Sequence, residues 1–510
     1  MVVRRTLIAA LALSIFSAGH LNADVRPHAL ISDNMVLQRG ISTPIWGSAE
    51  PGEKVTVAIA GQIAEATADA AGSWMVRLSP MEPGGPYEMT IAGSNTVKVN
   101  NVMVGEVWLC SGQSNMAMEV RQAKDADEEI AAADYPDIRL FDAPPRIRDL
   151  PARDVEARWR VCSPKSVARF SAAGYFFGRR LHREFDVPVG LICGAQGSSP
   201  AEAWTEIEAL KVGIDDPVAR WQGQVQEEGK AKADYEAELA AWEQRAKAEG
   251  KEPPHKPVRP YFLGRARVAQ PAGLWNGTIA PLVPYGIRGV IWYQGESNAS
   301  RGREHRKLLP AMIRSWRREW GQGEFPFLIV AIAPFGPVHD HPTDSGWAEV
   351  VEAQWMTAES VPNCGLAVTT DIGDAESAHP MNKQEVARRL ALIALAKVYG
   401  RDLVYAGPTY TAMETEGSRT RLRFKHVHGG LVAGGDGPLT GFAVAGEGRS
   451  FVWAEARIDG DTVVVWNEQV PRPVAVRYAW ARNPVCNLFN AEGLPAVPFR
   501  TDDWEQSGQY

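Results

Sequence analysis

Between about residue 101 and residue 403, short apolar runs alternate with longer amphipathic ones. The apolar runs predict strands, and runs with apolar residues three or four positions apart predict helices. The expected strands are Val102–Cys110, Val187–Cys193, Gly289–Tyr293, Phe325–Ile332 and Gly365–Asp371. The expected helices are Val167–Phe185, Arg306–Trp320, Ala348–Glu359 and Lys383–Tyr399. This alternation predicts an α/β fold in which helices cover a parallel sheet.

The segments on either side of this alternating part have a different pattern. In residues 24–100 and again in 404–510, apolar and polar residues alternate with a period of two, as in Lys54–Ala60 and Arg419–Lys425. Glycine and proline clusters separate these runs, which is typical of short strands joined by turns. A chain of 510 residues is also too long for one hydrophobic core. We therefore expect sandwich-like β-rich modules flanking an α/β domain over 101–403.

Residues 206–260 interrupt the α/β pattern. The run Lys230–Lys247 is rich in helix formers and charges, and the proline-rich stretch Pro253–Pro260 follows it. Such a run is typical of an exposed, solvated helix. We interpret it as a charged helical insertion without a role in the chemistry.

The first 23 residues have the pattern of a secretory signal peptide. Arg4 and Arg5 precede the apolar run Leu7–Phe16, and small residues near Ala23 offer a cleavage site. This predicts a secreted or periplasmic protein; an uncleaved anchor is the alternative, although the run is too short for a stable membrane span. The net charge is −7 and no basic stripe is present, so a nucleic acid partner is not expected.

The five cysteines do not form a metal-binding pattern. They are scattered, with no pair two residues apart, which argues against a zinc site. Export would permit disulfides, but an odd number leaves at least one thiol unpaired. The sequence does not decide their pairing.

The chemistry of the chain is most visible in Gly105–Met116. An apolar strand there breaks into a small polar loop that carries Ser114. Doubly wound α/β sheets expose their reactive groups at the carboxyl ends of strands, so Ser114 is a candidate nucleophile. A helix-capping serine is the alternative. The G-x-S-x-G pattern of α/β-hydrolases is absent.

A candidate base lies in the segment Asp371–Lys383, between an expected strand and an expected helix. His379 would have to be neutral beside the serine hydroxyl, and a helix N-terminus disfavours the imidazolium. Asp371, Asp374 and Glu376 precede it and could orient the ring. Alternatively, the histidine packs on the sheet and the acids cap turns.

Two further strand ends carry polar groups. Gln294–Asn298 follows an expected strand, and the Asn298 amide could donate to an oxyanion. Gly194–Pro200 follows another strand, and its glycines let a backbone N–H approach a ligand closely. Each segment could equally be an ordinary turn.

Together these segments resemble a known family. Ser114, Gly197, Asn298 and His379 follow the chain order Ser, Gly, Asn, His of the SGNH hydrolases. The runs Gly112–Met116, Trp292–Asn298 and His379–Pro380 resemble the sialate O-acetylesterase branch, and the similarity covers about residues 28–485. The resemblance implies an SGNH-type, flavodoxin-like α/β/α core of three layers.

The resemblance also implies roles. Ser114 would be the nucleophile and His379 the base, and an oxyanion hole would be formed by the Ser114 N–H, an N–H near Gly197 and the Asn298 amide. The same blocks suggest the substrate-binding residues Gln113, Gln294 and Glu296.

The chain departs from the family pattern at two places. Ser198 stands where the family usually has glycine, so the N–H that serves the oxyanion is left open. The family usually has an aspartate two or three residues before the histidine, where this chain has Ser377 and Glu376. Glu376 is our predicted orienting carboxylate; a Ser–His pair helped by a backbone carbonyl is the alternative.

The implied function is a carbohydrate esterase that removes O-acetyl groups from sialic acid or related sugars through an acyl-enzyme, without a metal or organic cofactor. Its expected partner is an O-acetylated sugar or glycan, and no oligomeric state is predicted. The alternatives are an acetylxylan esterase of the same fold, a non-catalytic carbohydrate-binding protein, and a lipase or thioesterase. No long apolar lid segment favours the last of these.

Overall fold

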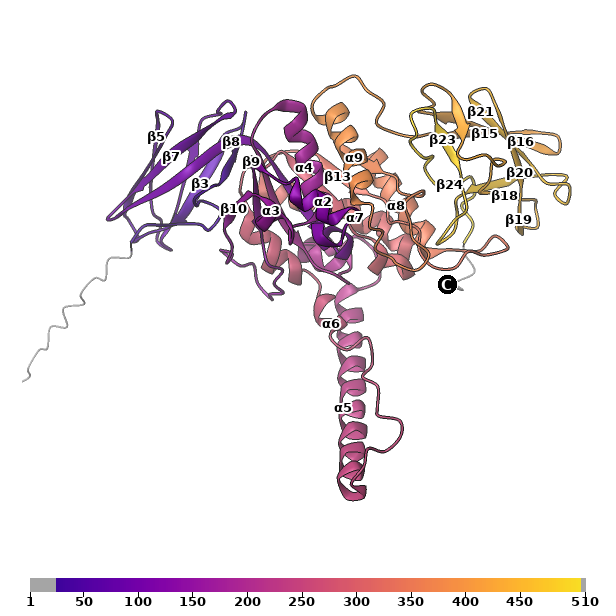
Figure 1. Ribbon diagram of the computed structural model, residues 1–510, viewed down its shortest axis with the longest axis horizontal. Coiled ribbons are helices and arrows are strands. Elements are labelled where there is room, and N and C mark those ends of the chain that lie inside the picture. The colour runs from indigo at the N-terminus through magenta and orange to yellow at the C-terminus, as the bar shows by residue number, and fades with distance from the viewer. Residues whose placement is uncertain (1–23, 506–510) are drawn as a thin grey trace, which may run out of the picture.

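The computed structural model describes residues 24–505. The predicted signal peptide, residues 1–23, lies outside the described residues. A central α/β body lies between two β-rich parts, and the long helix α5 (Pro217–Glu249) projects from the body as a stalk (Figure 1).

The central sheet is built on parallel strands. Their spatial order is β9 (Tyr135–Asp142), β11 (Val189–Ala195), β8 (Thr96–Gly112), β12 (Gly289–Tyr293), β13 (Phe327–Val330) and β14 (Cys364–Ala367). Strand β10 (Trp159–Cys162) runs antiparallel to β9 at the edge, so the sheet is mixed. The five predicted strands are all present, whereas β9 and the antiparallel edge strand β10 were not predicted.

Helices cover both faces of the sheet. Helices α4 (Ala172–Phe185) and α9 (Lys383–Ile393) pack on one face, and α7 (Gly302–Trp320) and α8 (Gly346–Ser360) pack together on the other. Side chains on successive strand residues point to opposite faces. Trp108 and Cys110 of β8 therefore join one core, while Val107 and Leu109 join the other. The remaining α-helices are α1 (Ser114–Ala117), α2 (Ala126–Ala131), α3 (Pro164–Val167) and α6 (Arg265–Val268).

The N-terminal strands form two sheets that bury side chains in a shared core. These strands are β1 (Arg26–Pro27), β2 (Val36–Gln38), β3 (Thr43–Ser48), β4 (Lys54–Ile59), β5 (Gln62–Thr67), β6 (Ser73–Leu78) and β7 (Gly84–Ala92). Strand β8 runs across residue 100, where we predicted a boundary. Its first half pairs with β7, and its second half pairs with β11 and β12. One continuous strand therefore joins the N-terminal part to the central sheet.

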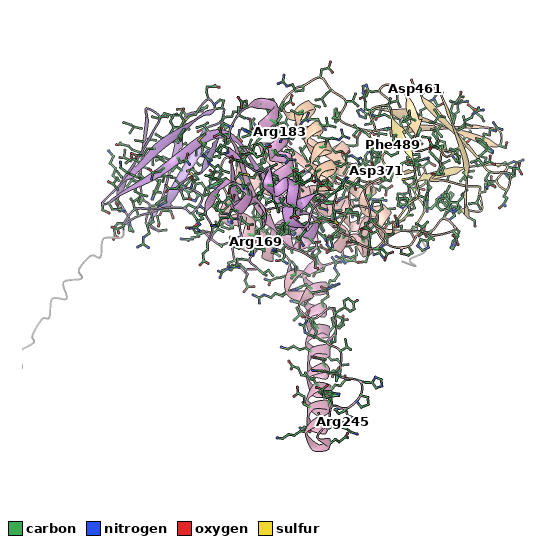
Figure 2. All side chains as sticks on the ribbon, viewed as in Figure 1. Arg169, Arg183, Arg245, Asp371, Asp461 and Phe489 are labelled. Atoms are coloured by element: carbon green, nitrogen blue, oxygen red, sulfur yellow. The ribbon has the colours of Figure 1, made fainter. Side chains whose placement is uncertain are left out.

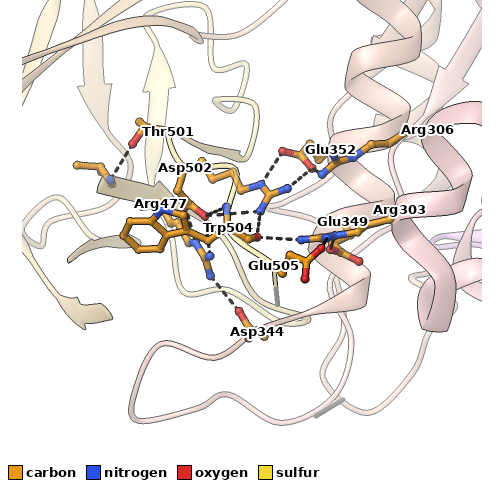
Figure 3. Close-up of polar contacts among 12 residues, drawn as sticks. Arg303, Arg306, Asp344, Glu349, Glu352, Arg477, Thr501, Asp502, Trp504 and Glu505 are labelled. Atoms are coloured by element: carbon orange, nitrogen blue, oxygen red, sulfur yellow. Dashed lines mark hydrogen bonds and ion pairs between the residues drawn. The ribbon is translucent and has the colours of Figure 1, made fainter. Parts of the chain in front are cut away.

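The C-terminal part consists of short antiparallel strands. They are β15 (Thr409–Glu416), β16 (Arg419–Lys425), β17 (Leu431–Ala433), β18 (Phe442–Ala445), β19 (Phe451–Trp453), β20 (Glu455–Asp459), β21 (Thr462–Trp466), β22 (Ala475–Tyr478), β23 (Leu488–Asn490) and β24 (Phe499–Arg500). Buried ion pairs hold this part against α7 and α8 (Figure 3). Arg500, with a side chain 3% exposed, donates to Glu352 of α8 at 2.9 Å, and Arg306 of α7 also binds Glu352.

Helix α5 lies within residues 206–260, where we expect a charged helical insertion. Asp216 caps it by accepting from the Val218 and Ala219 N–H groups, and Gly250 ends it in the left-handed conformation at φ +64°. Most of its residues are exposed. Within residues 24–505, no helix combines the length and the apolar character needed to cross a membrane.

The buried contact at Glu352 should stabilise the attachment of the C-terminal part. Glu352→Gln removes the carboxylate charge shared by Arg306 and Arg500 and leaves Arg500 with Asp502 at 3.6 Å; breaking a buried pair costs about 3 kcal/mol. We expect a clear fall in the midpoint of thermal unfolding, measured by circular dichroism.

The matched control is Glu359→Gln on the same helix. Glu359 pairs with Lys425 of β16 at an exposed position, where an ion pair contributes about 1 kcal/mol or less. Equal midpoints for the two variants would contradict the assignment.

Candidate active site

The register of three strands brings the candidate site together. Gly112 at the end of β8 pairs with Ala195 at the end of β11 and with Tyr293 at the end of β12. The chain therefore leaves all three strands at the same level of the sheet. The loops that begin at Gln113, Gln196 and Gln294 converge there, at the carboxyl edge where α/β sheets bind ligands.

A tight turn presents Ser114. Gly112 has φ +140°, and a Cβ there would lie 2.2 Å from the Tyr293 carbonyl oxygen, so no other residue fits without a shift. Gln113 is extended, and Ser114 is the first residue of α1. The first N–H groups of a helix have no acceptor within the helix, so the Ser114 N–H is left for other partners.

A long loop delivers His379 to Ser114. It starts at the end of β14, which lies three strand spacings from β8, or about 14 Å across the sheet edge. The loop returns over this edge before α9 begins at Lys383. His379 Nε2 lies 2.8 Å from Ser114 Oγ, which is hydrogen-bonding distance. The structure thus brings together the two residues predicted as nucleophile and base.

Two buried side chains hold the histidine loop in place. Asn115 Nδ2 donates to the Ala378 carbonyl at 2.8 Å, and Lys383 Nζ donates to the Pro380 carbonyl at 2.7 Å. Lys383 Nζ also donates to Asn115 Oδ1 at 2.7 Å. The residues on both sides of His379 are therefore fixed. Asn115 and Lys383 were not assigned a role from the sequence, although both lie within motifs that carry Ser114 and His379.

Glu296 completes this network. Its Oε1 accepts from Asn115 Nδ2 at 2.6 Å, and burial raises the pKa of its carboxyl group. Burial lowers the pKa of Lys383 to about 7. Burial, followed by the positive charge of Lys383, also lowers the pKa of His379. The site therefore favours a neutral imidazole.

None of the three acids that precede His379 in its loop is bonded to the histidine ring. Asp371 forms an ion pair with Arg389 at 2.6 Å, and Asp374 accepts from the Glu376 N–H at 2.9 Å. Glu376 itself is exposed. Across residues 24–505, no hydrogen bond joins the His379 ring to a carboxylate. The geometry therefore does not support the predicted orienting role of Glu376, and Asp371 and Asp374 stabilise the loop instead.

The glycine turn after β11 lies against the serine. A Cβ on Gly197 would be 3.5 Å from the Ser114 Cβ, so the hydrogen side of Gly197 faces the serine across little more than the space of one methyl group. Ser198 has φ +60°, the left-handed conformation that glycine adopts readily. The backbone thus keeps a glycine-like conformation at the position where the sequence departs from the family.

Asn298 does not reach the pocket. It is 1% exposed, its Oδ1 accepts from the Ala201 N–H at 2.9 Å, and its Nδ2 donates to Glu202 at 2.9 Å. Gln294 lies beside it, also buried, and donates to Asn298 Oδ1 at 2.8 Å. The predicted oxyanion role of Asn298 and the predicted substrate contact of Gln294 therefore find no support, because both side chains brace the wall behind the pocket.

Gln113 lies closer to the serine than either of these residues. Its Oε1 accepts from the Gly295 and Ser297 N–H groups, both at 3.4 Å. Its Nε2 has no partner in the part of the chain that the structure describes, and Gln113 lines the pocket. Glu296 lines the pocket as well, so two of the three predicted substrate-binding residues border it.

Ser114 and His379 open into a cavity of about 640 Å³, within the usual range for ligand sites. The far wall of this cavity comes from the insertion, for which we predict no role in the chemistry; the insertion extends past its predicted end at residue 260 and here includes residues up to Ala269. One stripe of α5 contributes Pro217, Arg220, Trp221, Gln224, Glu227 and Glu228, and the segment around α6 contributes Tyr261, Phe262, Arg265, Ala266 and Ala269. These α5 positions recur every three or four residues, as one helix face requires.

The cysteines and acidic groups form no second centre. All five cysteines are free thiols, and burial raises the pKa of Cys364 to about 11. Within residues 24–505, no three His, Cys, Asp or Glu side chains gather as a metal ion would need.

Comparison with known proteins assigns the chain to a family. A family model described as "Carbohydrate esterase, sialic acid-specific acetylesterase" matches residues 273–395. Sialate O-acetylesterase of Mus musculus is 30% identical over 92% of this chain and 93% of its own length, and that of Rattus norvegicus is 32% identical over the same shares. This chain belongs to the sialate O-acetylesterase family. The relationship therefore spans Ser114 as well as the block that carries His379.

A solved structure supports the same family at the level of the fold. The crystal structure of a carbohydrate acetylesterase from Xanthomonas citri is 34% identical and superposes with a TM-score of 0.81. The match covers 94% of this chain and 100% of that one. The α/β body and its β-rich parts are thus shared with a carbohydrate esterase.

The close approach at Gly112 makes it sensitive to any side chain. We expect Gly112→Ala to cost about 2 kcal/mol of stability, because the Cβ meets the Tyr293 carbonyl at a positive φ. The β8 end must then shift together with Ser114. The measurement is the midpoint of thermal unfolding.

Gly223→Ala on α5 is the control, since nothing lies within 4 Å of the added Cβ. Replacing a helical glycine there should be neutral or stabilise by about 0.5–1 kcal/mol. A Gly112→Ala protein as stable as the control would show that the turn tolerates a side chain.

Proposed function

We propose that this protein is a serine carbohydrate esterase that removes O-acetyl groups from sialic acids or related acetylated sugars. The observation that carries the proposal is the 2.8 Å contact of Ser114 Oγ with His379 Nε2 at the base of a cavity of about 640 Å³. Membership in a family of sialate O-acetylesterases supports the choice of ester and of sugar.

The proposed reaction proceeds through an acetyl-enzyme. His379 takes the Ser114 hydroxyl proton as Ser114 Oγ attacks the acetyl carbonyl carbon. That carbon becomes tetrahedral, and its former carbonyl oxygen becomes an oxyanion. When this collapses, the bond to the sugar oxygen breaks and His379 returns the proton to that oxygen. Water, activated in the same way by His379, then releases acetate and restores the serine.

The proposed oxyanion hole has two backbone donors and one side-chain donor. The backbone donors are the Ser114 N–H at the start of α1 and the Gly197 N–H, whose residue faces Ser114. We assign the side-chain donor to Gln113, because its Nε2 has no protein partner within residues 24–505 and the residue lines the pocket. One such donor contributes roughly 3–4 kcal/mol to the transition state.

We propose a Ser–His pair without an orienting carboxylate. The support is that Asn115 and Lys383 bind the carbonyls of Ala378 and Pro380, and so fix the backbone that carries His379. The loop then performs the orienting task that a carboxylate performs in a triad. The Lys383 charge disfavours the imidazolium, which keeps the ring in its basic form.

We further propose that the central part is an SGNH-type domain over 101–403, flanked by domains over 24–100 and 404–510. Supporting this, Ser114, Gly197, Asn298 and His379 all follow strands of one sheet at its carboxyl edge. Export to the periplasm or the medium is the corresponding proposal for residues 1–23, supported by their signal-peptide pattern.

Removal of the serine hydroxyl tests the proposed function directly. Ser114→Ala should lower kcat for p-nitrophenyl acetate and for an O-acetylated sialic acid by a factor on the order of 10⁴ or more, because no acetyl-enzyme forms. Circular dichroism should show a folded protein. Ser300→Ala, on the same pocket wall, should keep near-normal rates.

Glu376→Gln separates the Ser–His pair from a triad. In a pair, this exposed residue can be neutralised with little change in kcat, whereas an orienting carboxylate would cost orders of magnitude. Ser114→Ala with near-normal turnover would end the proposed function; a large loss in Glu376→Gln would end the two-residue mechanism alone.

The pH dependence should follow His379. Because the base must be neutral, kcat/KM falls as pH drops through the pKa of His379. That pKa is lowered, so activity should persist below pH of about 6.5, the usual value for histidine. Lys383→Met removes a positive charge, and the acid limb should move to higher pH. Lys397→Met, beyond the end of α9, should leave it in place; a limb unmoved by Lys383→Met would contradict this coupling.

A further inference from the structure

The insertion forms one side of the esterase cavity, facing Ser114 and His379. Helix α5 enters the cavity wall with its first three turns, and the segment around α6 lies across them. The rest of α5 continues away from the body, and Arg245 lies near its free end (Figure 2). The insertion therefore has a base that borders the cavity and a stalk that does not.

The base is fixed to the α/β body by charge. Arg220 of α5 forms ion pairs with Glu202 at 2.9 Å and with Glu304 of α7 at 3.2 Å. Glu202 is buried and also accepts from Asn298, the residue that braces the wall behind the pocket. Because the same carboxylate serves the α/β body and α5, the base keeps a defined position relative to Ser114.

The two segments of the base are also fixed to each other. Trp221 Nε1 donates to the Ala266 carbonyl at 2.7 Å, and Glu228 accepts from the Ala266 N–H at 2.8 Å. These contacts hold α6 across α5. The wall is thus a preformed surface, and preformed surfaces bind ligands at a lower entropic cost.

Aromatic side chains form the apolar part of this wall. Trp221, Tyr261 and Phe262 all line the cavity, and Tyr261 is 79% exposed. Apolar surface gathered beside a cavity, as these three side chains provide, is typical of a ligand-binding site. The C–H face of a pyranose ring has the size and polarity to cover such a ring, while its hydroxyls stay in water.

Arg265 supplies the available positive charge of the wall. Arg220 and Arg301 also line the cavity, but each is paired with both Glu202 and Glu304. Arg265 lies over the Tyr261 ring at 4.9 Å and has no ion pair within residues 24–505. Its guanidinium is therefore held beside the aromatic surface and free to bind an anion.

We propose that the base of the insertion is the sugar-binding wall of the esterase cavity, where Trp221 and Tyr261 pack on the sugar ring and Arg265 binds a carboxylate of an acidic O-acetylated sugar. This inference rests on the proposed function, since the acetyl group must lie at Ser114. The sugar then extends from the ester bond toward α5. Guanidinium binds carboxylate through paired hydrogen bonds, which gives both charge and geometry.

Glu227 places a negative charge on the same wall as Arg265. It also lines the cavity and is exposed, and its carboxylate opposes an anionic ligand. Glu228 also lines the cavity, but its carboxylate accepts from the Gly264 and Ala266 N–H groups. The wall thus has Arg265, which favours an acidic sugar, and Glu227, whose exposed carboxylate disfavours it. Neutralising each should change kcat/KM in opposite directions.

The experiment compares three substrates: p-nitrophenyl acetate, an O-acetylated sialic acid, and the methyl ester of that sialic acid. Arg265→Ala should lower kcat/KM for the acid about 10-fold or more, the usual effect of losing a charge-assisted hydrogen bond, with little change for the methyl ester and the aryl acetate. Glu227→Gln should raise kcat/KM for the acid alone. Arg267→Ala, on α6 but outside the cavity lining, and Arg245→Ala on the stalk are the matched controls.

The aromatic part is tested by Tyr261→Ala, with Trp221→Phe as a variant that keeps an aromatic ring. Tyr261→Ala should raise KM for both sugar esters and leave p-nitrophenyl acetate unchanged, whereas Trp221→Phe should have a smaller effect. Thermal unfolding of each variant shows whether the wall remains folded.

Different results would contradict carboxylate binding, the sugar-binding wall and the esterase activity. Equal losses on the acid and its methyl ester in Arg265→Ala would overturn carboxylate binding. Unchanged sugar kinetics in Tyr261→Ala would overturn the sugar-binding wall while Ser114→Ala remained inactive. A wild-type protein that hydrolyses none of the three esters would instead overturn the proposed function.

Discussion

The active arrangement depends on the register of β8 with its two parallel neighbours. Gly112 pairs with both Ala195 and Tyr293, so three loops start at one level of the sheet. A shift of one residue in either pairing would move the loop of Gly197, or the loop that follows Tyr293, out of level with Ser114 and turn alternate side chains to the other face. The close approach of Gly112 to the Tyr293 carbonyl fixes this register, because a larger residue has no room. Backbone pairing between the strands therefore positions the serine without help from side-chain contacts.

The histidine is positioned differently, by a buried polar network. Its loop starts three strands away, and no ladder hydrogen bond can fix its end beside Ser114. Asn115 and Lys383 perform this task by binding carbonyls on both sides of His379. Burying an amine and a carboxylate in this way is costly unless each has partners. The lowered pKa of Lys383 and the raised pKa of Glu296 reflect that cost, and the same burial favours a neutral imidazole.

The cavity lies between the α/β body and the insertion, which interrupts the α/β part of the sequence. The α/β body supplies the reacting groups, since Ser114 follows the end of β8 and His379 lies on the loop between β14 and α9. The insertion supplies the surface that faces them, through helix α5 and the segment around α6. Loops and insertions can vary without disturbing a sheet, so a wall of this kind can adapt a fixed catalytic centre to a particular sugar. Glu202 links the two elements, since it binds Arg220 of α5 and Asn298 of the body.

The sequence alone indicated the strand–helix order, five strands of the central sheet and the pairing of Ser114 with His379, because hydrophobic period and motif residues are local signals. It missed β9 and β10 at one edge of that sheet. The tertiary structure decided what the other polar residues do. Asn298, Gln294 and Glu376 have suitable side chains in suitable motifs, yet Glu202 and Ala201 engage Asn298, and Glu376 lies in water. The exposed-helix pattern of the insertion likewise gave no sign of which stripe of α5 faces the cavity. A side chain's role depends on which distant groups surround it, and those distances exist only once the chain has folded.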